Sequence, residues 1–189
     1  VSIETGTSGS DPEVLRGWLR ASRAVGASLM RTLFADASPG LHQERVRLRE
    51  VLPDFRDAGV AIAIENHEKY SIAELLALLE DLREGVGVCL DTVNSLGRGE
   101  GVREVTEALL PHTIILHAKD FQAIRGATDM GFTITGAVTG QGRLDIPRLL
   151  AAAGKHMPEI SVILEQWTPL TGSLEEAMAA ADNPDELKL

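Results

Sequence analysis

Four aliphatic runs in the chain each end on a side chain that can bind a metal ion or move a proton. The interval from the first of these side chains to the second equals the interval from the second to the third, which indicates one strand–helix unit repeating in register. The four are Glu65 in AIAIENH, Asp91 in GVCLDT, His117 in IILHAKD and Glu165 in SVILEQ.

A single acidic residue at a strand end is most often an ordinary polar cap, but four at successive strand ends suggest a shared site. Three carboxylates and one imidazole, without thiolates, are unlike a structural zinc site. They suit one divalent ion such as Mn²⁺, Mg²⁺, Co²⁺ or Zn²⁺, with positions left open for substrate oxygens. Burying the four groups without compensation would be costly, so a bound cation is the favoured explanation.

The elements that would position these groups follow one alternating pattern. Aliphatic runs alternate with amphipathic helical stretches, which predicts βαβ units and a parallel sheet in an α/β fold. Asp11 before Pro12 indicates one helix start, and Ser71 with Glu74 forms a capping box at another. The expected strands fall within residues 1–6, 28–36, 60–68, 86–94, 113–121 and 160–167.

Two architectures fit this alternation, an open doubly wound sheet and a closed (β/α)8 barrel. The stretch ETGTSGSD is rich in Gly but lacks the GxGxxG pattern of doubly wound nucleotide binders. In a barrel, all strand carboxyl ends open on one face, where sites are built. The four candidate ligands at strand ends therefore favour the barrel. Residues 1–189 are assigned to a single domain because no linker interrupts them.

The interval from His117 to Glu165 is longer than one repeat. The excess lies in residues 122–145, a stretch rich in Gly and Thr that is expected to form a loop over the site and to close on a ligand. A tolerated surface insertion is an equally good interpretation.

Composition excludes several classes of partner. Lys and Arg number 18 against 28 Asp and Glu, for a formal charge of −10, whereas nucleic acids and anionic membranes require a basic footprint. No apolar run is long enough to span a membrane, and there is no signal-peptide pattern. Cys89 is the single cysteine, so an internal disulfide is excluded and a cytoplasmic location is expected.

The four strand ends resemble those of the xylose isomerase-like TIM barrels, the sugar phosphate isomerase/epimerase family. A Gly-x-Gly-x-x-Asp stretch before a late helix is also similar to that family. The resemblance implies a (β/α)8 TIM barrel of which this chain covers about six units, strands 3 to 8, with the first two units missing. The motifs are IEN at 64–66, LDT at 90–92, HAKD at 117–120, LEQ at 164–166 and GQGRLDIPRLL at 140–150.

The resemblance also implies an activity, that of a metal-dependent isomerase or epimerase acting on a sugar or sugar acid through an enediolate. Glu65 and Glu165 would each bind the metal and act as acid or base, on opposite sides of the substrate. Asp91 and His117 would be plain ligands, and manganese is one expected metal. The implied partner is a small carbohydrate, and a homo-oligomer is left open.

Lys119 and Asn94 are expected on the substrate side of this site. Lys119 shares the strand parity of His117 and points inward, where it would act in catalysis by stabilising an oxyanion, bind a carboxylate, or pair with a nearby acidic residue. Family members that act on free ketoses often have His at the position of Asn94. This departure puts simple ketose epimerisation in doubt.

Three further residues are candidate substrate contacts. Arg31 would grip a phosphate or carboxylate, or pair with Glu4, which is slightly favoured. His67 would donate a hydrogen bond to substrate or lie in a solvent-facing loop. Trp167 would wall the pocket or pack as a rim aromatic.

Three alternative functions remain open. The first is a lyase, a dehydratase or decarboxylase of an oxo-sugar acid on the same metal site, for which Asn94 and Lys119 would suit a carboxylated substrate. The second is an abasic-site endonuclease, which would need a His-rich multi-zinc site and basic loops, while this acidic chain has five His. The third is a non-catalytic binding protein.

Overall fold

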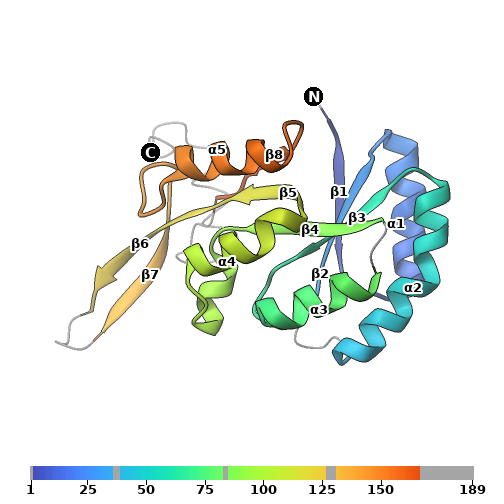
Figure 1. Ribbon diagram of the computed structural model, residues 1–189, viewed down its shortest axis with the longest axis horizontal. Coiled ribbons are helices and arrows are strands. Elements are labelled where there is room, and N and C mark those ends of the chain that lie inside the picture. The colour runs from blue at the N-terminus through green and yellow to red at the C-terminus, as the bar shows by residue number, and fades with distance from the viewer. Residues whose placement is uncertain (1, 36–38, 83–84, 127–130, 167–189) are drawn as a thin grey trace, which may run out of the picture.

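Six parallel strands form the central sheet of the computed structural model, which describes residues 2–35, 39–82, 85–126 and 131–166. The strands lie in the order β1-β2-β3-β4-β5-β8 and curve as part of a barrel (Figure 1). This confirms the predicted α/β class and the TIM-barrel type with six units. The strands are β1 (Glu4–Ser8), β2 (Leu29–Leu33), β3 (Ala61–Glu65), β4 (Val86–Asp91), β5 (Thr113–Ala118) and β8 (Ser161–Leu164).

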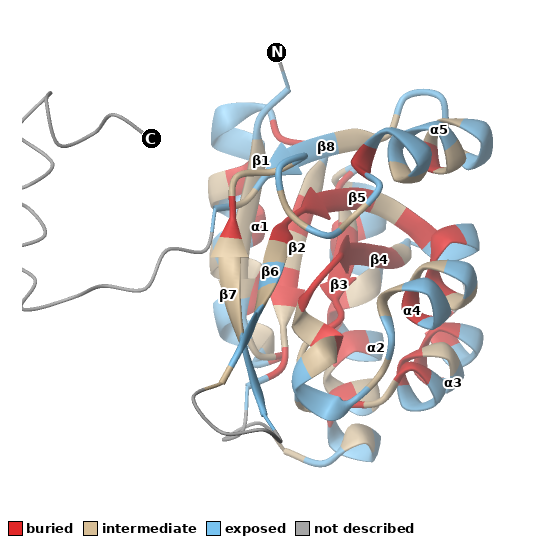
Figure 2. Cartoon of the chain, turned by 90° about the vertical axis from the view of Figure 1, so that its left-hand side faces the viewer, coloured by how far each residue is buried: buried red, intermediate tan, exposed pale blue. Residues whose placement is uncertain are grey.

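Helices connect successive strands and lie along the outer side of the curved sheet (Figures 1 and 2). They are α1 (Pro12–Val25), α2 (Leu41–Asp57), α3 (Ile72–Leu82), α4 (Val102–Leu109) and α5 (Ile146–His156), with the short 3-10 turns η1 (Asn94–Arg98) and η2 (Leu110–His112). The sequence SLEEAMAAAD at 173–182 also predicts a helix, but it lies outside the described residues.

Two predicted helix starts are confirmed. The Asp11 carboxylate accepts hydrogen bonds from the backbone N–H groups of Glu13 and Val14, which satisfies donors that an α-helix leaves free at its first turn. Before α3, the Glu74 carboxylate accepts from both the N–H and the hydroxyl of Ser71, while Ser71 Oγ accepts from the Glu74 N–H. These contacts explain why α1 and α3 begin where they do.

The strands at the centre of the sheet are largely buried (Figure 2), and their residues alternate between two environments. One set packs against the helices, in clusters that include Ile62, Ile64 and Leu90. The other set faces inward, where Ala63, Cys89 and Ile115 form a small buried cluster. Residues two positions further along a strand point the same way, so the next residues on the inner face are the polar ones that end β3, β4 and β5.

The stretch after β5 is not the loop that the sequence suggested. It forms an antiparallel hairpin of β6 (Asp120–Arg125) and β7 (Phe132–Ala137), which projects from the sheet in Figure 1. Its Gly and Thr content concealed two short alternating segments rich in β-branched and aromatic residues, FQAIR and FTIT, which favour strands.

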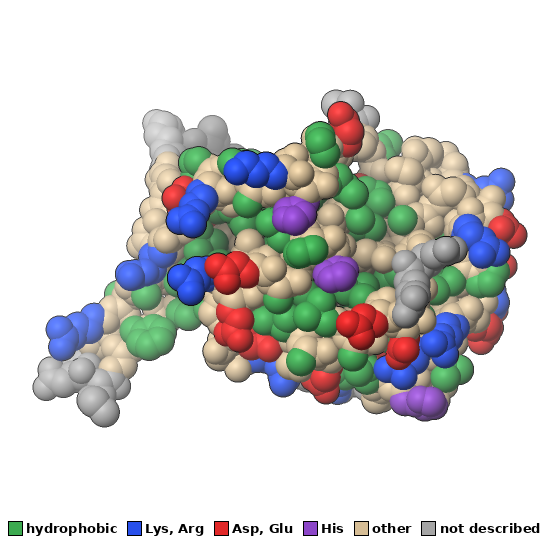
Figure 3. All heavy atoms as spheres, in the orientation of Figure 1, with side chains coloured by type: hydrophobic (Ala, Val, Ile, Leu, Met, Phe, Trp, Pro, Cys, Tyr) green, Lys and Arg blue, Asp and Glu red, His purple; other side chains and the backbone are tan. Residues whose placement is uncertain are grey.

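The surface carries no continuous basic patch on the face of described residues that Figure 3 shows, where acidic and basic side chains are interspersed. Across the described residues, none of the helices is both long and apolar enough to cross a membrane.

Candidate metal centre

The four predicted ligands converge at the carboxyl end of the sheet. Each offers one ligand atom, and these atoms all lie within 4.8 Å of one another. Asp91 and His117 are level in the sheet, whereas Glu65 is level with Cys89 and the strand register staggers along the edge. Glu65, Asp91 and His117 are buried, while Glu165, just past the end of β8, is partly exposed.

Three buried atoms in this cluster lack a neutral hydrogen-bond partner and contact only other charged or ionisable side chains of the site. They are Glu65 Oε2, Asp91 Oδ2 and His117 Nδ1, one from each buried member of the set. Two carboxylate oxygens and an imidazole nitrogen gathered in this way are suitable ligands for Mg²⁺, Mn²⁺ or Zn²⁺. The residues present therefore fit a divalent ion.

Two cationic side chains reach the same carboxylates. Lys119 Nζ lies 3.0 Å from Asp91 Oδ2 and 2.8 Å from Glu165 Oε1, as the ion-pair interpretation of this lysine predicted. Arg31 Nε lies 3.2 Å from Glu65 Oε2. The favoured pairing of Arg31 with Glu4 is wrong, because the guanidinium lies over Gly6, where it donates to the Thr7 carbonyl and reaches across to β3.

Burial and charge shift the acidity of these groups. Burial raises the pKa of Glu65 above its usual value, against the opposing pull of Arg31. The nearness of His117, whose Nδ1 lies 2.8 Å from Glu165 Oε2, and then the Lys119 ammonium lower the pKa of Glu165 to about 2. Burial works to lower the pKa of Lys119, but the Asp91 and Glu165 carboxylates outweigh it and leave that pKa raised. In the protein without metal, Glu165 is thus an anion and Lys119 a cation.

Two side chains hold the strand ends in place and were not singled out from the sequence. The fully buried Asn66 donates from Nδ2 to the Asp91 carbonyl and to Ser95 Oγ, and accepts from the Asp91 N–H. Thr92 Oγ1 donates to the Lys119 carbonyl and accepts from the Lys119 N–H. Both lie directly after a ligand, within the motifs IEN and LDT, and that adjacency was the available signal.

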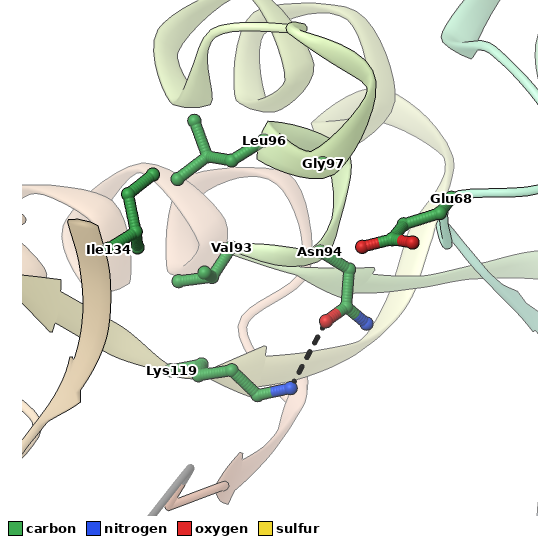
Figure 4. Close-up of a pocket in the computed structure, with 7 residues that line it drawn as sticks. All are labelled: Glu68, Val93, Asn94, Leu96, Gly97, Lys119 and Ile134. Carbon is green, nitrogen blue, oxygen red and sulfur yellow. Dashed lines mark hydrogen bonds between the residues drawn. The ribbon is translucent and has the colours of Figure 1, made fainter. Parts of the chain in front are cut away.

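Asn94 links the cluster to a pocket of about 290 Å³, drawn in Figure 4. Its Nδ2 donates to Glu65 Oε1 at 2.8 Å, and its Oδ1 accepts from Lys119 Nζ at 3.2 Å. Val93, Leu96 and Ile134 form an apolar wall opposite these polar atoms. Ile134 comes from the hairpin, so the stretch after β5 does reach the pocket.

The remaining predicted residues lie elsewhere. His67 is half-buried after β3 and belongs neither to the ligand cluster nor to the lining of the pocket. Trp167 lies outside the described residues. Asp120, the last residue of the HAKD motif, is buried and accepts from the backbone N–H groups of Phe121, Gly140, Gly142 and Leu144.

Comparison with known proteins points to one family. A family model described as a xylose isomerase-like TIM barrel matches residues 13–185. The chain is 30% identical to the 3-oxo-isoapionate decarboxylase of Pectobacterium atrosepticum over 185 residues, which cover 96% of this chain and 67% of the relative.

Solved structures show the same fold. D-psicose 3-epimerase, determined in the presence of D-fructose, matches with a TM-score of 0.67 at 12% identity, covering 95% of this chain and 69% of the epimerase. A xylose isomerase-like TIM barrel protein from Mycobacterium smegmatis, in complex with magnesium, matches with a TM-score of 0.65 at 14% identity, covering 87% of this chain and 67% of that protein. The chain thus spans about two thirds of the length of these relatives.

Proposed function

The chain belongs to the xylose isomerase-like TIM barrel family, and we propose that it is a metal-dependent lyase that removes CO₂ from an oxo-sugar acid. The observation that carries the proposal is the position of Lys119. Its ammonium lies among the ligand carboxylates and also lines the pocket beside Asn94. A cation at the join between metal site and pocket suits a substrate that carries both an oxo group and a carboxylate.

The residue set supports a division of roles. Glu65, Asp91, His117 and Glu165 would hold one divalent ion, and Mg²⁺ is a reasonable first choice because the Mycobacterium smegmatis relative was crystallised with it. Such an ion polarises a carbonyl and favours negative charge on its oxygen.

The chemistry of a 3-oxo acid defines what the protein side chains must do. The bond between the carboxyl carbon and the adjacent carbon breaks, and its electron pair moves toward the oxo oxygen. The carbon that lost CO₂ then takes a proton. Lys119 would face the negative charge as it moves from the carboxylate to the oxygen. Asn94, which contacts both Glu65 and Lys119, would keep the two in fixed relation. The apolar wall of Val93, Leu96 and Ile134 would limit the access of water.

The name of the Pectobacterium relative supports this choice over isomerisation, since that protein is a decarboxylase of a 3-oxo acid at 30% identity. Isomerisation or epimerisation is the second candidate. It is favoured by Glu65 and Glu165, two carboxylates that approach the cluster from different strands and would exchange a proton across a substrate.

One experiment separates the two. The protein would be loaded with Mg²⁺ or Mn²⁺ and incubated in D₂O with 3-oxo-sugar acids and, separately, with ketoses. The proposed decarboxylase releases one CO₂ for each substrate molecule consumed. An isomerase or epimerase incorporates solvent deuterium into a substrate that keeps all its carbons, and this result without CO₂ would overturn the proposal. The Asp91→Asn variant serves as the control for metal-independent decay.

A further inference from the structure

Asp91 has one oxygen left for a cation. Its Oδ1 accepts hydrogen bonds from the backbone N–H groups of Val93 and Asn94, both at 2.8 Å. Its Oδ2 accepts no hydrogen bond from a neutral donor and lies 3.0 Å from Lys119 Nζ. The oxygen that a metal ion would use is therefore the oxygen that faces the lysine.

The charge balance around this oxygen disfavours binding a metal ion while the Lys119 ammonium stays in place. The carboxylates of Glu65, Asp91 and Glu165 face the side chains of Lys119 and Arg31, so one negative charge is unbalanced. A divalent ion carries two positive charges, whereas only one is needed to neutralise the cluster. Two cations held against Asp91 Oδ2 would repel each other strongly, because charges inside a protein are poorly screened.

We propose that Lys119 is an internal counter-ion that exchanges with the divalent ion, occupying the Asp91 and Glu165 carboxylates when metal is absent and leaving Asp91 when metal binds. This inference rests on the metal site of the proposed function. Glu165 can retain the lysine on Oε1, since its Oε2 is the oxygen that approaches His117. The exchange is therefore centred on Asp91.

The structure provides a place for the displaced ammonium. Lys119 Nζ already lies 3.2 Å from Asn94 Oδ1, and both side chains line the pocket (Figure 4). A small rotation of the long, flexible lysine side chain away from Asp91 keeps this contact and turns the charge toward the pocket. Metal binding would then place a cation where an anionic substrate group enters.

Metal affinity measured without substrate tests the exchange. Mn²⁺ would be titrated into the wild-type protein, Lys119→Met, Lys119→Arg and Lys155→Met, with binding followed by calorimetry and by the electron paramagnetic resonance signal of free Mn²⁺. Lys155 is an exposed lysine in the last turn of α5 and controls for the loss of one positive charge elsewhere. We expect Lys119→Met to bind Mn²⁺ at least about tenfold more tightly than wild type, because the competing cation is gone. Lys119→Arg and Lys155→Met should bind as wild type does.

Thermal unfolding in EDTA gives a second readout. Lys119→Met should unfold at a lower temperature than wild type without metal, and the difference should shrink at saturating Mn²⁺, since the metal then supplies the missing charge. If Lys119→Met does not fold, Lys119→Gln takes its place in both measurements.

The outcomes separate the exchange from the metal site itself. Equal Mn²⁺ affinity in all four proteins would overturn the exchange and leave the metal site standing, and weaker binding by Lys119→Met would also overturn it. An absence of Mn²⁺ binding in both wild type and Lys119→Met would overturn the metal site and the exchange together.

Discussion

The Asn66 side chain forms hydrogen bonds with both backbone polar groups of Asp91. The Asn66 Nδ2 donates to the Asp91 carbonyl at 2.9 Å, and its Oδ1 accepts from the Asp91 N–H at 2.8 Å. Asn66, which directly follows β3, thus fixes the position of Asp91 at the end of β4 and with it the position of the Asp91 carboxylate in the site. The contact extends the link between the two strands past Glu65, where β3 ends.

Replacing Asn66 by Ala should destabilise the fold by about 3 kcal/mol, because it leaves the buried N–H and carbonyl of Asp91 without partners. Urea denaturation of the metal-free protein measures this. Mn²⁺ affinity should fall as well, since Asp91 loses its fixed position.

Asn94→Ala is the matched comparison for that variant. It removes an amide of the same size that contacts Glu65 and Lys119 but not the Asp91 backbone carbonyl. We expect a smaller loss of stability, about 1 kcal/mol. An equal loss of stability in the two variants would show that the hydrogen bonds to the Asp91 backbone add no more stability than those of Asn94.

Removal of ligand oxygens should abolish metal binding while the fold persists. The double variant Asp91→Asn, Glu165→Gln keeps the side-chain shapes but withdraws two negative charges from the ion. Wild type should bind about one divalent ion per chain, and the double variant none at the same concentration. Metal analysis after dialysis measures both, with Glu159→Gln, an exposed carboxylate away from the cluster, as the charge control. Metal retained by the double variant would place the ion elsewhere.

The capping box of α3 should give a pH-dependent contribution to stability. The hydrogen bonds from the Ser71 N–H and hydroxyl lower the pKa of Glu74 below its ordinary value of 4.5. A carboxyl whose pKa is lower in the folded state stabilises the fold above its unfolded pKa, and that contribution disappears as the pH falls through the folded value. Glu74→Gln should therefore destabilise at pH 7, and the difference from wild type should shrink below about pH 4.5. A difference that stays constant to pH 3 would contradict this assignment.

Ser71→Ala tests the same cap from the other residue. It removes the hydroxyl that accepts from the Glu74 N–H, and an N-cap serine contributes about 1 kcal/mol. Thermal unfolding at pH 7 measures the loss.

The convergence of the four candidate ligands could be predicted because each ends an aliphatic run of a parallel sheet. Equal intervals between Glu65, Asp91 and His117 imply equal strand–helix units, and parallel strands bring their carboxyl ends to one edge. Alternation along each strand predicted which side chains face inward. None of these inferences requires knowledge of which residues lie level in the sheet.

The partner of Arg31 could not be predicted, because it depends on register. Arg31 is level with Ala63, so Glu65 is the next residue on the same face of β3 and within reach of the guanidinium. Glu4 and Arg31 are close in the order of strand ends, but β1 pairs Glu4 with Leu29 and Gly6 with Arg31. The hairpin escaped prediction for a different reason, because its two strands pair only with each other and carry little buried apolar surface.

The base of this hairpin depends on a close approach that only glycine permits. A methyl group on Gly142 would contact the Asp120 carboxylate and lie 2.5 Å from the Phe121 carbonyl oxygen. The same carboxylate accepts hydrogen bonds from the Gly140, Gly142 and Leu144 N–H groups, so moving it away from the new methyl group would break them. Gly142→Ala should therefore destabilise the fold by about 2 kcal/mol. Gly154→Ala, in α5 with open space around the new methyl group, should instead stabilise it by about 1 kcal/mol. Urea denaturation of the two variants measures this contrast, and a neutral Gly142→Ala would mean that the Asp120 contacts yield at no cost.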